Sequence, residues 1–181
     1  GFEAAVCGEI PIIETVRNLP SDADVQGFVG IFNGTSNYII SKMIEGRDYS
    51  EALGAAQKAG FAQADPTLDV NGSDATQKLA ILSSIIFHTP VEWRSIWRRG
   101  IEELEGDDVK EFVRAGLTVR PLSSARRTEH GLELWAGPGL LREHHTLAPV
   151  EGETAGVALN LFGRDEPFAM TGKGAGSIPT A

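Results

Sequence analysis

The spacing of apolar residues changes along this chain, and the change predicts two kinds of secondary structure. In the front half, apolar side chains recur every three to four residues, which is the spacing of amphipathic helices. Glycine or proline follows most of these stretches, as is typical of helix ends. After Gly116 the apolar runs are short and lie between turn residues, a pattern that favours strands.

Together these patterns predict an α+β domain, with a mixed, largely antiparallel sheet and helices packed on one face. The expected helices cover 11–16, 35–46, 50–60, 74–88 and 108–115, with Ser50 capping the third and Ser73 or Asp74 the fourth. The expected strands cover 4–13, running into a turn, and 25–32, 117–119, 132–135, 155–161 and 168–171. We expect residues 1–181 to form one domain, and because the first residue is not Met, we expect a longer protein around it.

Lys78 lies inside the helix expected from Asp74, at a position that the apolar pattern predicts to be buried. An ammonium group is costly to remove from water, and the positive end of the helix dipole is close by. The residues at the i, i+3, i+4 and i+7 positions of one helix face, which we expect to face the core, are Lys78, Ile81, Leu82 and Ile85.

Asp74 lies four residues before Lys78, so the two side chains can pair on the helix surface. Such a spacing most often means an exposed ion pair worth about 0.3–0.5 kcal/mol. A half-buried lysine beside a carboxylate, with Asp65 and Asp69 nearby, is instead typical of a proton-transfer site. The apolar face favours the second interpretation.

Composition limits the classes of partner. The 181 residues are 41% hydrophobic, enough for one sizeable core, and 25 acidic against 16 basic side chains give a net charge of -9. That charge argues against binding nucleic acid or an anionic membrane surface. No apolar run approaches the roughly 18–20 residues of a membrane span. A single cysteine, Cys7, excludes an internal disulfide and fits a reducing compartment, so we expect a cytoplasmic protein.

Two motifs do not fit the sites that they suggest. Gly172–Gly176 looks like a phosphate-binding loop, but Pro167 and Gly174 stand where such a loop needs glycine and a hydroxyl side chain. The alternative that this glycine-rich segment touches a cofactor held elsewhere remains open. Asp69–Asp74 looks like a calcium loop, but its glycine comes fourth rather than sixth and no glutamate closes it.

Several stretches resemble the catalytic and dimerisation domain of homoserine dehydrogenase, in order along the whole chain. They are F-E-A-A-V-C-G-E-I-P-I-I (2–13), G-I-F-N-G-T-S-N-Y-I-I (30–40), E-A-L-G-A-A-Q-K-A-G (51–60), A-D-P-T-L-D-V-N-G-S-D-A-T-Q-K-L-A-I-L (64–82) and G-K-G-A-G-S-I-P-T-A (172–181). The resemblance implies a homodimer that interconverts L-aspartate 4-semialdehyde and L-homoserine with NAD(P)H, towards threonine and methionine. It also implies that the nucleotide-binding domain lies outside this chain.

The resemblance assigns roles to particular residues. Lys78 looks like the lysine that transfers a proton to the substrate oxygen, with Asp74 as its partner. The positions that would bind the substrate are Gly60, Gln63, Asp69 and Thr35, and Gly176 would approach the nicotinamide cofactor. The family's sodium site matches Glu3 with the backbone carbonyls of Val6, Gly8 and Ile10.

Gln63 departs from the family pattern, because a substrate-binding glutamate is usual there. An amide can hydrogen-bond, but it cannot offer negative charge to a substrate ammonium group. Two hypotheses therefore stay open. The chain is a homoserine dehydrogenase domain, or it is a diverged homologue with an altered substrate or no activity that serves as a ligand-binding or dimerisation domain.

Overall fold

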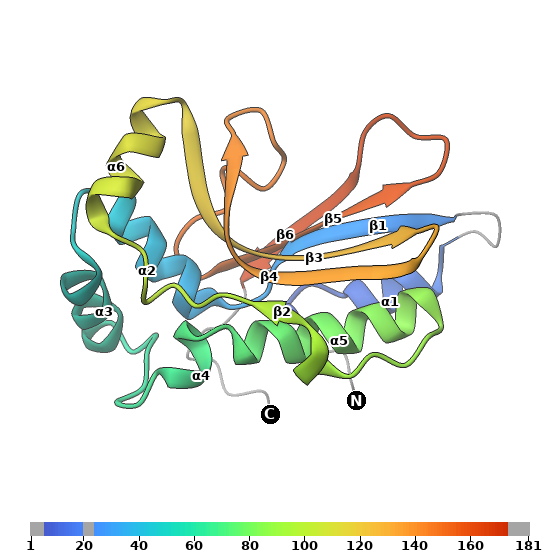
Figure 1. The fold of residues 1–181 in the computed structure, drawn as a ribbon, viewed down its shortest axis with the longest axis horizontal. Helices are drawn as coiled ribbons and strands as arrows, with labels where there is room; N and C mark the ends of the chain where they lie inside the picture. Colours follow the sequence, from blue (N-terminus) through green and yellow to red (C-terminus); the bar gives the residue numbers. More distant parts are fainter. Residues whose placement is uncertain (1–5, 20–23, 174–181) are drawn as a thin grey trace.

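A six-stranded sheet forms the centre of the fold (Figure 1). The computed structural model describes residues 6–19 and 24–173, and the strands run in the order β2-β4-β3-β1-β5-β6. All neighbouring strands are antiparallel except β2 and β4. The strands are β1 (Val25–Ile31), β2 (Trp97–Arg98), β3 (Leu117–Thr128), β4 (Gly131–Arg142), β5 (Thr154–Leu161) and β6 (Phe168–Lys173). The predicted mixed, largely antiparallel sheet is confirmed.

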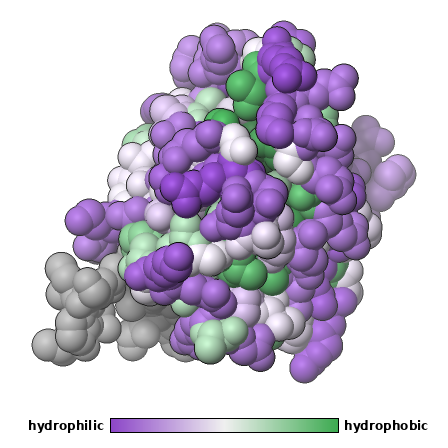
Figure 2. Space-filling view, turned by 90° about the vertical axis from the view of Figure 1, so that its left-hand side faces the viewer, coloured by the Kyte–Doolittle hydropathy of each residue, from purple (hydrophilic) through white to green (hydrophobic). Residues whose placement is uncertain are grey.

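The helices lie along one face of the sheet and at one end of it (Figure 1). They are α1 (Ile12–Arg17), α2 (Gly34–Ile44), α3 (Tyr49–Lys58), α4 (Thr67–Val70), α5 (Ser73–Phe87), α6 (Gly106–Arg114) and the short 3-10 helix η2 (Trp93–Ser95). Helices α1 and α5 follow the sheet face, whereas α2, α3 and α6 group at the end, where hydrophilic residues cover most of the surface (Figure 2). Among the described residues, no helix combines the length and the apolar character that a membrane crossing needs.

Three hydrophobic clusters hold these layers together. The largest packs α1 and α5 against the sheet and includes Phe28 and Leu79, both nearly inaccessible to solvent. The second joins α2, α3 and α6 around Met43. The third lies on the opposite face of the sheet, where Leu147, from the loop between β4 and β5, covers Leu122. A loop rather than a helix therefore covers that face.

Two helix starts differ from the predicted caps. Helix α3 is capped by Asp48, whose side chain accepts a hydrogen bond from the backbone of Glu51 (2.8 Å) while the Glu51 carboxylate accepts one from the Asp48 backbone (3.3 Å). The prediction of Ser50 as the cap was therefore wrong. Helix α5 begins after Gly72 without a side-chain cap, and Ser73 and Asp74 lie within its first turn, so the prediction of either as the cap was also wrong.

The strand expected over 4–13 is absent from the described part of that segment. Cys7 and Gly8 both have left-handed backbone conformations, with φ of 63° and 57°. They form a turn that leads to α1 after Pro11. The helix predicted over 11–16 is confirmed by α1, and a turn precedes it as expected; only the strand was wrong, because the left-handed turn at Cys7 and Gly8 interrupts it.

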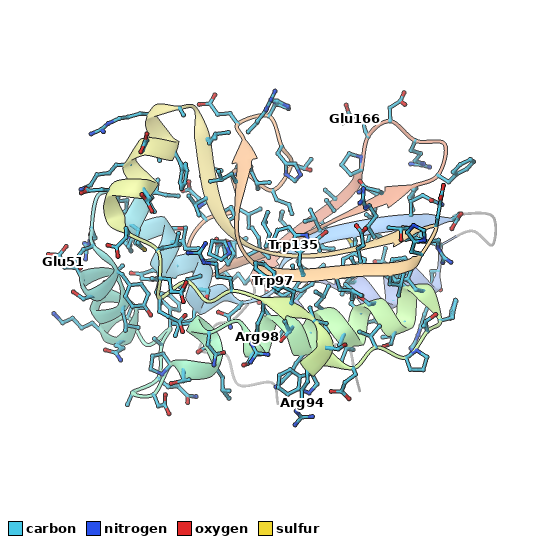
Figure 3. The ribbon with its side chains drawn as sticks, viewed as in Figure 1. Glu51, Arg94, Trp97, Arg98, Trp135 and Glu166 are labelled. Carbon is cyan, nitrogen blue, oxygen red and sulfur yellow. The ribbon has the colours of Figure 1, made fainter. Side chains whose placement is uncertain are left out.

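Strands β3 and β4 are much longer than predicted, and each continues through a proline. The predicted strands covered only the short apolar runs 117–119 and 132–135, whereas a proline, which cannot donate to a neighbouring strand, is tolerated in each of the observed strands. In the structure Pro121 lies opposite Pro138, so that neither needs a donor from the other. The two-residue strand β2 was not predicted; its Trp97 lies opposite Trp135 of β4 (Figure 3).

Candidate functional site

Segments far apart in the sequence meet around Lys78. They are the junction of β1 with α2, the short helix α4, and the first turns of α5. The Asn33 side chain caps α2 by accepting a hydrogen bond from the backbone N–H of Ser36 (2.7 Å). Gly72, with φ of 79°, allows the sharp turn from α4 into α5. Both junctions are short, so the polar residues on them converge.

Lys78 forms the predicted ion pair with Asp74. Its ammonium nitrogen lies 2.8 Å from Oδ2 of Asp74, and it also donates a hydrogen bond to the backbone carbonyl of Phe32 (3.0 Å). The side chains of Lys78 and Asp74 are 25% and 28% exposed. Asp74 lies in the first turn of α5, where the helix dipole stabilises a carboxylate. The ammonium is thus oriented by protein groups while solvent, or a ligand, can still reach it.

The predicted orientation of α5 was wrong. Leu82 is fully buried, but Lys78, Ile81 and Ile85 are only half-buried. The face that packs into the core follows the same i, i+3, i+4, i+7 pattern, but counted from Leu79 instead of Lys78. Its members are Leu79, Leu82, Ser83 and Ile86. Lys78 therefore lies at the border of the buried face, so its burial was overestimated.

Asn33 connects the two carboxylates of the site, a role that the sequence analysis missed. Its side-chain Nδ2 donates to Oδ1 of Asp69 (2.7 Å) and to Oδ2 of Asp74 (2.9 Å). The residue is only 4% exposed. Its position in the G-I-F-N-G-T run, directly after an expected strand, was the available signal.

Asp69 is tied to α2 by a second contact. The hydroxyl of Ser36 donates to the backbone carbonyl of Asp69 at 2.9 Å. Asp69 thus has its side chain held by Asn33 and its backbone held by Ser36, from two positions one turn apart. The structure therefore brings together the predicted site residues Asp69, Asp74 and Lys78.

The other predicted substrate positions lie around the loop after α3. Thr35 is nearly buried, and its hydroxyl donates to the backbone carbonyl of Phe61 at 2.7 Å, which attaches the loop to α2. Gly60 is exposed and has φ of 79°. The Gln63 side chain is also exposed, and its backbone carbonyl accepts a hydrogen bond from Gln57 (3.3 Å). These residues border the cluster without contacting Lys78 directly.

The turn at Cys7 lies near the lysine. Burial raises the pKa of the Cys7 thiol to about 12, and the nearby positive charge of Lys78 opposes part of this rise. The backbone N–H of Glu9 donates to the carbonyl of Lys173 at 3.2 Å, which joins this turn to the end of β6. The thiol next to the ammonium is therefore neutral.

Two of the predicted site residues, Glu3 and Gly176, lie outside the described residues. Of the predicted sodium ligands, Val6 and Ile10 are buried and Gly8 is exposed. The Ile10 carbonyl accepts a hydrogen bond from Ile12 (2.7 Å), which leaves its second lone pair. Within 6–19 and 24–173, no three His, Cys, Asp or Glu side chains are grouped to hold a metal ion.

The sequence profile of the homoserine dehydrogenase family matches residues 11–181. This chain belongs to the homoserine dehydrogenase family. The homoserine dehydrogenase of Neisseria gonorrhoeae is 39% identical over 181 residues, which cover 99% of this chain and 41% of that protein. The homoserine dehydrogenase of Bacillus subtilis is also 39% identical, over 182 residues that cover 99% of this chain and 42% of that protein. The predicted family is confirmed.

Solved structures of homoserine dehydrogenases share this fold. The enzyme from Thiobacillus denitrificans aligns with a TM-score of 0.92 at 39% identity, covering 97% of this chain and 41% of that one. An S. aureus homoserine dehydrogenase aligns with a TM-score of 0.81 at 33% identity, covering 87% and 40%. The chain thus spans well under half the length of the relatives that it matches.

Proposed function

We propose that this chain is the substrate-binding and proton-transfer part of an NAD(P)-dependent homoserine dehydrogenase. The reaction is the interconversion of L-aspartate 4-semialdehyde and L-homoserine, in the synthesis of threonine and methionine in the cytoplasm. The observation that supports this most strongly is the half-buried Lys78 ammonium, fixed 2.8 Å from Asp74 and 3.0 Å from the Phe32 carbonyl.

In the direction of reduction, Lys78 donates a proton from its ammonium group to the aldehyde oxygen of the substrate. The nicotinamide cofactor supplies the hydride to the carbonyl carbon when it is bound. In the direction of oxidation, neutral Lys78 accepts the hydroxyl proton of homoserine. Asp74 and the Phe32 carbonyl orient Nζ for both transfers, since each accepts one of its hydrogens.

The amino acid end of the substrate would lie against the carboxylates and the loop after α3. Its ammonium group prefers negative charge, which Asp69 and Asp74 can offer. Thr35 and Gly60 would shape the edge of the pocket, and the Gln63 amide would supply a neutral hydrogen-bonding group where relatives of this family have a carboxylate.

The cofactor and a cation complete the proposal. The described sheet has none of the parallel β-α-β units that bind dinucleotides, so NAD(P)H would be held mostly outside these residues, with Gly176 approaching it. A sodium ion would be held by Glu3 and the backbone carbonyls of Val6, Gly8 and Ile10, because hard oxygen ligands suit such an ion.

A second copy of the chain would cover the face of the sheet that lacks helices. Val29, Trp135 and Ala169 on that face are only partly buried. An apolar sheet face that is covered only by a loop, and that leaves apolar side chains partly exposed, is typical of an interface between subunits. We expect a homodimer in sedimentation at micromolar concentration, and a monomer under those conditions would contradict this part of the proposal.

Activity of the full-length protein tests the central proposal. Homoserine with NAD⁺ or NADP⁺ should produce reduced cofactor, whereas the 181-residue chain alone should produce none, because the nucleotide-binding part is absent. Full-length protein that binds homoserine without turnover would favour the diverged homologue, for which the uncharged Gln63 is the supporting observation. Turnover by the isolated chain would contradict the proposal that the cofactor binds mostly in a nucleotide-binding part outside this chain.

A further inference from the structure

We propose that Asn33 is a positioning residue that holds the carboxylates of Asp69 and Asp74 at a fixed spacing and, through Asp74, aims the ammonium of Lys78. This inference rests on the proposed function and adds a residue to it. The Asn33 side chain bonds to Asp69, to Asp74 and to the backbone of Ser36, so its effect on Lys78 passes through Asp74.

The hydrogen bonds of the Asn33 side chain allow only one of the two orientations that exchange its amide oxygen and nitrogen. An amide NH2 group has two hydrogens, and here one goes to Asp69 (2.7 Å) and the other to Asp74 (2.9 Å). The amide oxygen accepts the backbone N–H of Ser36 (2.7 Å). A flipped amide would turn its oxygen toward two carboxylates and its NH2 toward an N–H donor. The acceptor and donor pattern around Asn33 therefore fixes which way it points.

The location of Asn33 gives this amide a rigid base. It is the N-cap of α2, directly after β1, and is 4% exposed. The preceding residue, Phe32, uses its carbonyl to accept a hydrogen bond from Lys78 (3.0 Å). Consecutive residues thus hold the lysine twice, once directly and once through Asp74. A shift of this junction would move the carboxylate and the ammonium together.

The charge arrangement explains why a neutral donor is needed there. Two carboxylates close together repel each other, and only Asp74 is paired with Lys78. The Asn33 amide donates to both without adding charge of its own. A carboxylate at position 33 would add a third negative group, whereas a serine would keep the cap of α2 and remove the link between the carboxylates.

The matched control is Asn37, one turn further along α2. Its side-chain NH2 also makes two hydrogen bonds, to the backbone carbonyls of Val150 and Thr154 (both 3.1 Å), and it is fully buried. It contacts none of the site carboxylates in the described structure. Asn37→Ser should therefore lower stability without altering the chemistry, which separates a structural effect from a positioning effect.

The kinetic test is a double-mutant cycle in the full-length protein with homoserine and NADP⁺. Asn33→Ser should lower kcat by about 10- to 100-fold, the range expected for the loss of a hydrogen bond to a charged group. In the Lys78→Ala background the same change should lower kcat by less than about threefold, because no ammonium is left to aim. KM should rise in both backgrounds, since Asp69 is released in each. Equal losses of kcat in the two backgrounds, or the same loss from Asn37→Ser, would overturn the proposal.

A second cycle needs no activity. Asn33→Ser and Asp74→Ala should be coupled in the folding equilibrium constant by about fivefold or more, and Asn37→Ser with Asp74→Ala should not. Additive effects of Asn33 and Asp74 would overturn the link between them. A wild type without turnover would instead overturn the proposed function, and this cycle would then decide alone whether Asn33 holds the carboxylates.

Discussion

Lys78 and Arg120 each pair with a carboxylate, but the fold treats the two cations differently. The Arg120 guanidinium, on β3, is 1% exposed and donates to the Ala148 carbonyl twice (2.8 and 3.1 Å), and its partner Glu151 is 69% exposed. Lys78 stays 25% exposed, and its partner oxygen is shared with Asn33.

This difference fits a structural role for Arg120 and the proposed proton-transfer role for Lys78. Burial lowers the pKa of Arg120, and Glu151 opposes that effect, yet a guanidinium still keeps its proton at any physiological pH. It serves to fasten the loop between β4 and β5. An ammonium can give up a proton, and Lys78 remains within reach of solvent. The proposed proton transfer therefore fits the cation that is less completely enclosed.

The largest effect is expected from Lys78→Ala in the full-length protein. We expect kcat to fall by about 10² or more, as for the loss of a positioned acid or base, with little change in stability. Lys42→Ala is the control, because Lys42 forms a 2.7 Å ion pair with Glu45 and is 24% exposed, yet lies away from the site. Steady-state kinetics of both variants provide the measurement. A Lys78→Ala enzyme with near-normal kcat would leave this pair with only a structural role.

The opposite result is expected for Arg120→Met. Methionine keeps much of the packing, but the Ala148 carbonyl loses its donors, which should destabilise the fold by about 1–3 kcal/mol in denaturant unfolding. Turnover per folded molecule should stay close to that of the wild type. Glu151→Gln should change stability by less than about 1 kcal/mol, since that carboxylate is largely exposed. A stabilised Arg120→Met variant would show that the buried cation is dispensable.

A smaller effect is expected at Gln63, which is exposed and is proposed to border the substrate pocket. Gln63→Glu gives a substrate ammonium a charged partner, so KM for homoserine should fall by about 5- to 30-fold with kcat little changed. Asn160→Asp adds the same charge at an exposed position of β5 and should leave KM unaltered. If Gln63→Glu does not lower KM for homoserine, the result would favour a pocket adapted to a different substrate.

The smallest effect concerns Cys7, the neutral neighbour of Lys78. Its pKa is raised from 9.0 to about 12 in the folded state, so the unfolded thiol ionises first as the pH rises. The folded protein then holds more protons, and its stability should fall between those two values. In denaturant unfolding, the free energy of unfolding of Cys7→Ala should increase relative to that of the wild type as the pH rises above about 9. A difference that stays constant with pH would contradict the buried, neutral thiol.

The sequence predicted these features unevenly, for reasons that the residues make clear. Helix α2 was predicted nearly to its bounds, because its apolar period and the glycine after it are local signals. The pair Asp74 and Lys78 was also predictable, since i, i+4 spacing brings two side chains together on any helix. The buried face of α5 was predicted about one residue out of register, because four residues starting at Lys78 and four starting at Leu79 fit nearly the same pattern.

Features that depend on distant segments could not be predicted in this way. The bonds of Asn33 reach residues 36 and 41 positions away, so its role appears only when β1, α4 and α5 are assembled. The cap of α3, by contrast, had a local signal that was missed, because Asp48 and Glu51 have the three-residue spacing of a capping box, which favours Asp48 over Ser50.

The facing prolines of β3 and β4 also protect the sheet from unwanted partners. Opposed prolines cannot exchange N–H···O bonds, so their missing donors point outward, toward where a further strand would bind. In the described structure, β1 pairs with β3 only as far as Ser123, and β2 pairs with β4 only as far as Ala136. Beyond Pro121 and Pro138 the two strands continue as a ribbon. Helices α2 and α6 contact β3, where Pro121 is buried, whereas on the β4 side the half-buried Pro138 interrupts the row of amide donors. Such an edge is a poor template for another chain, so this ribbon should resist edge-to-edge aggregation while the protein folds.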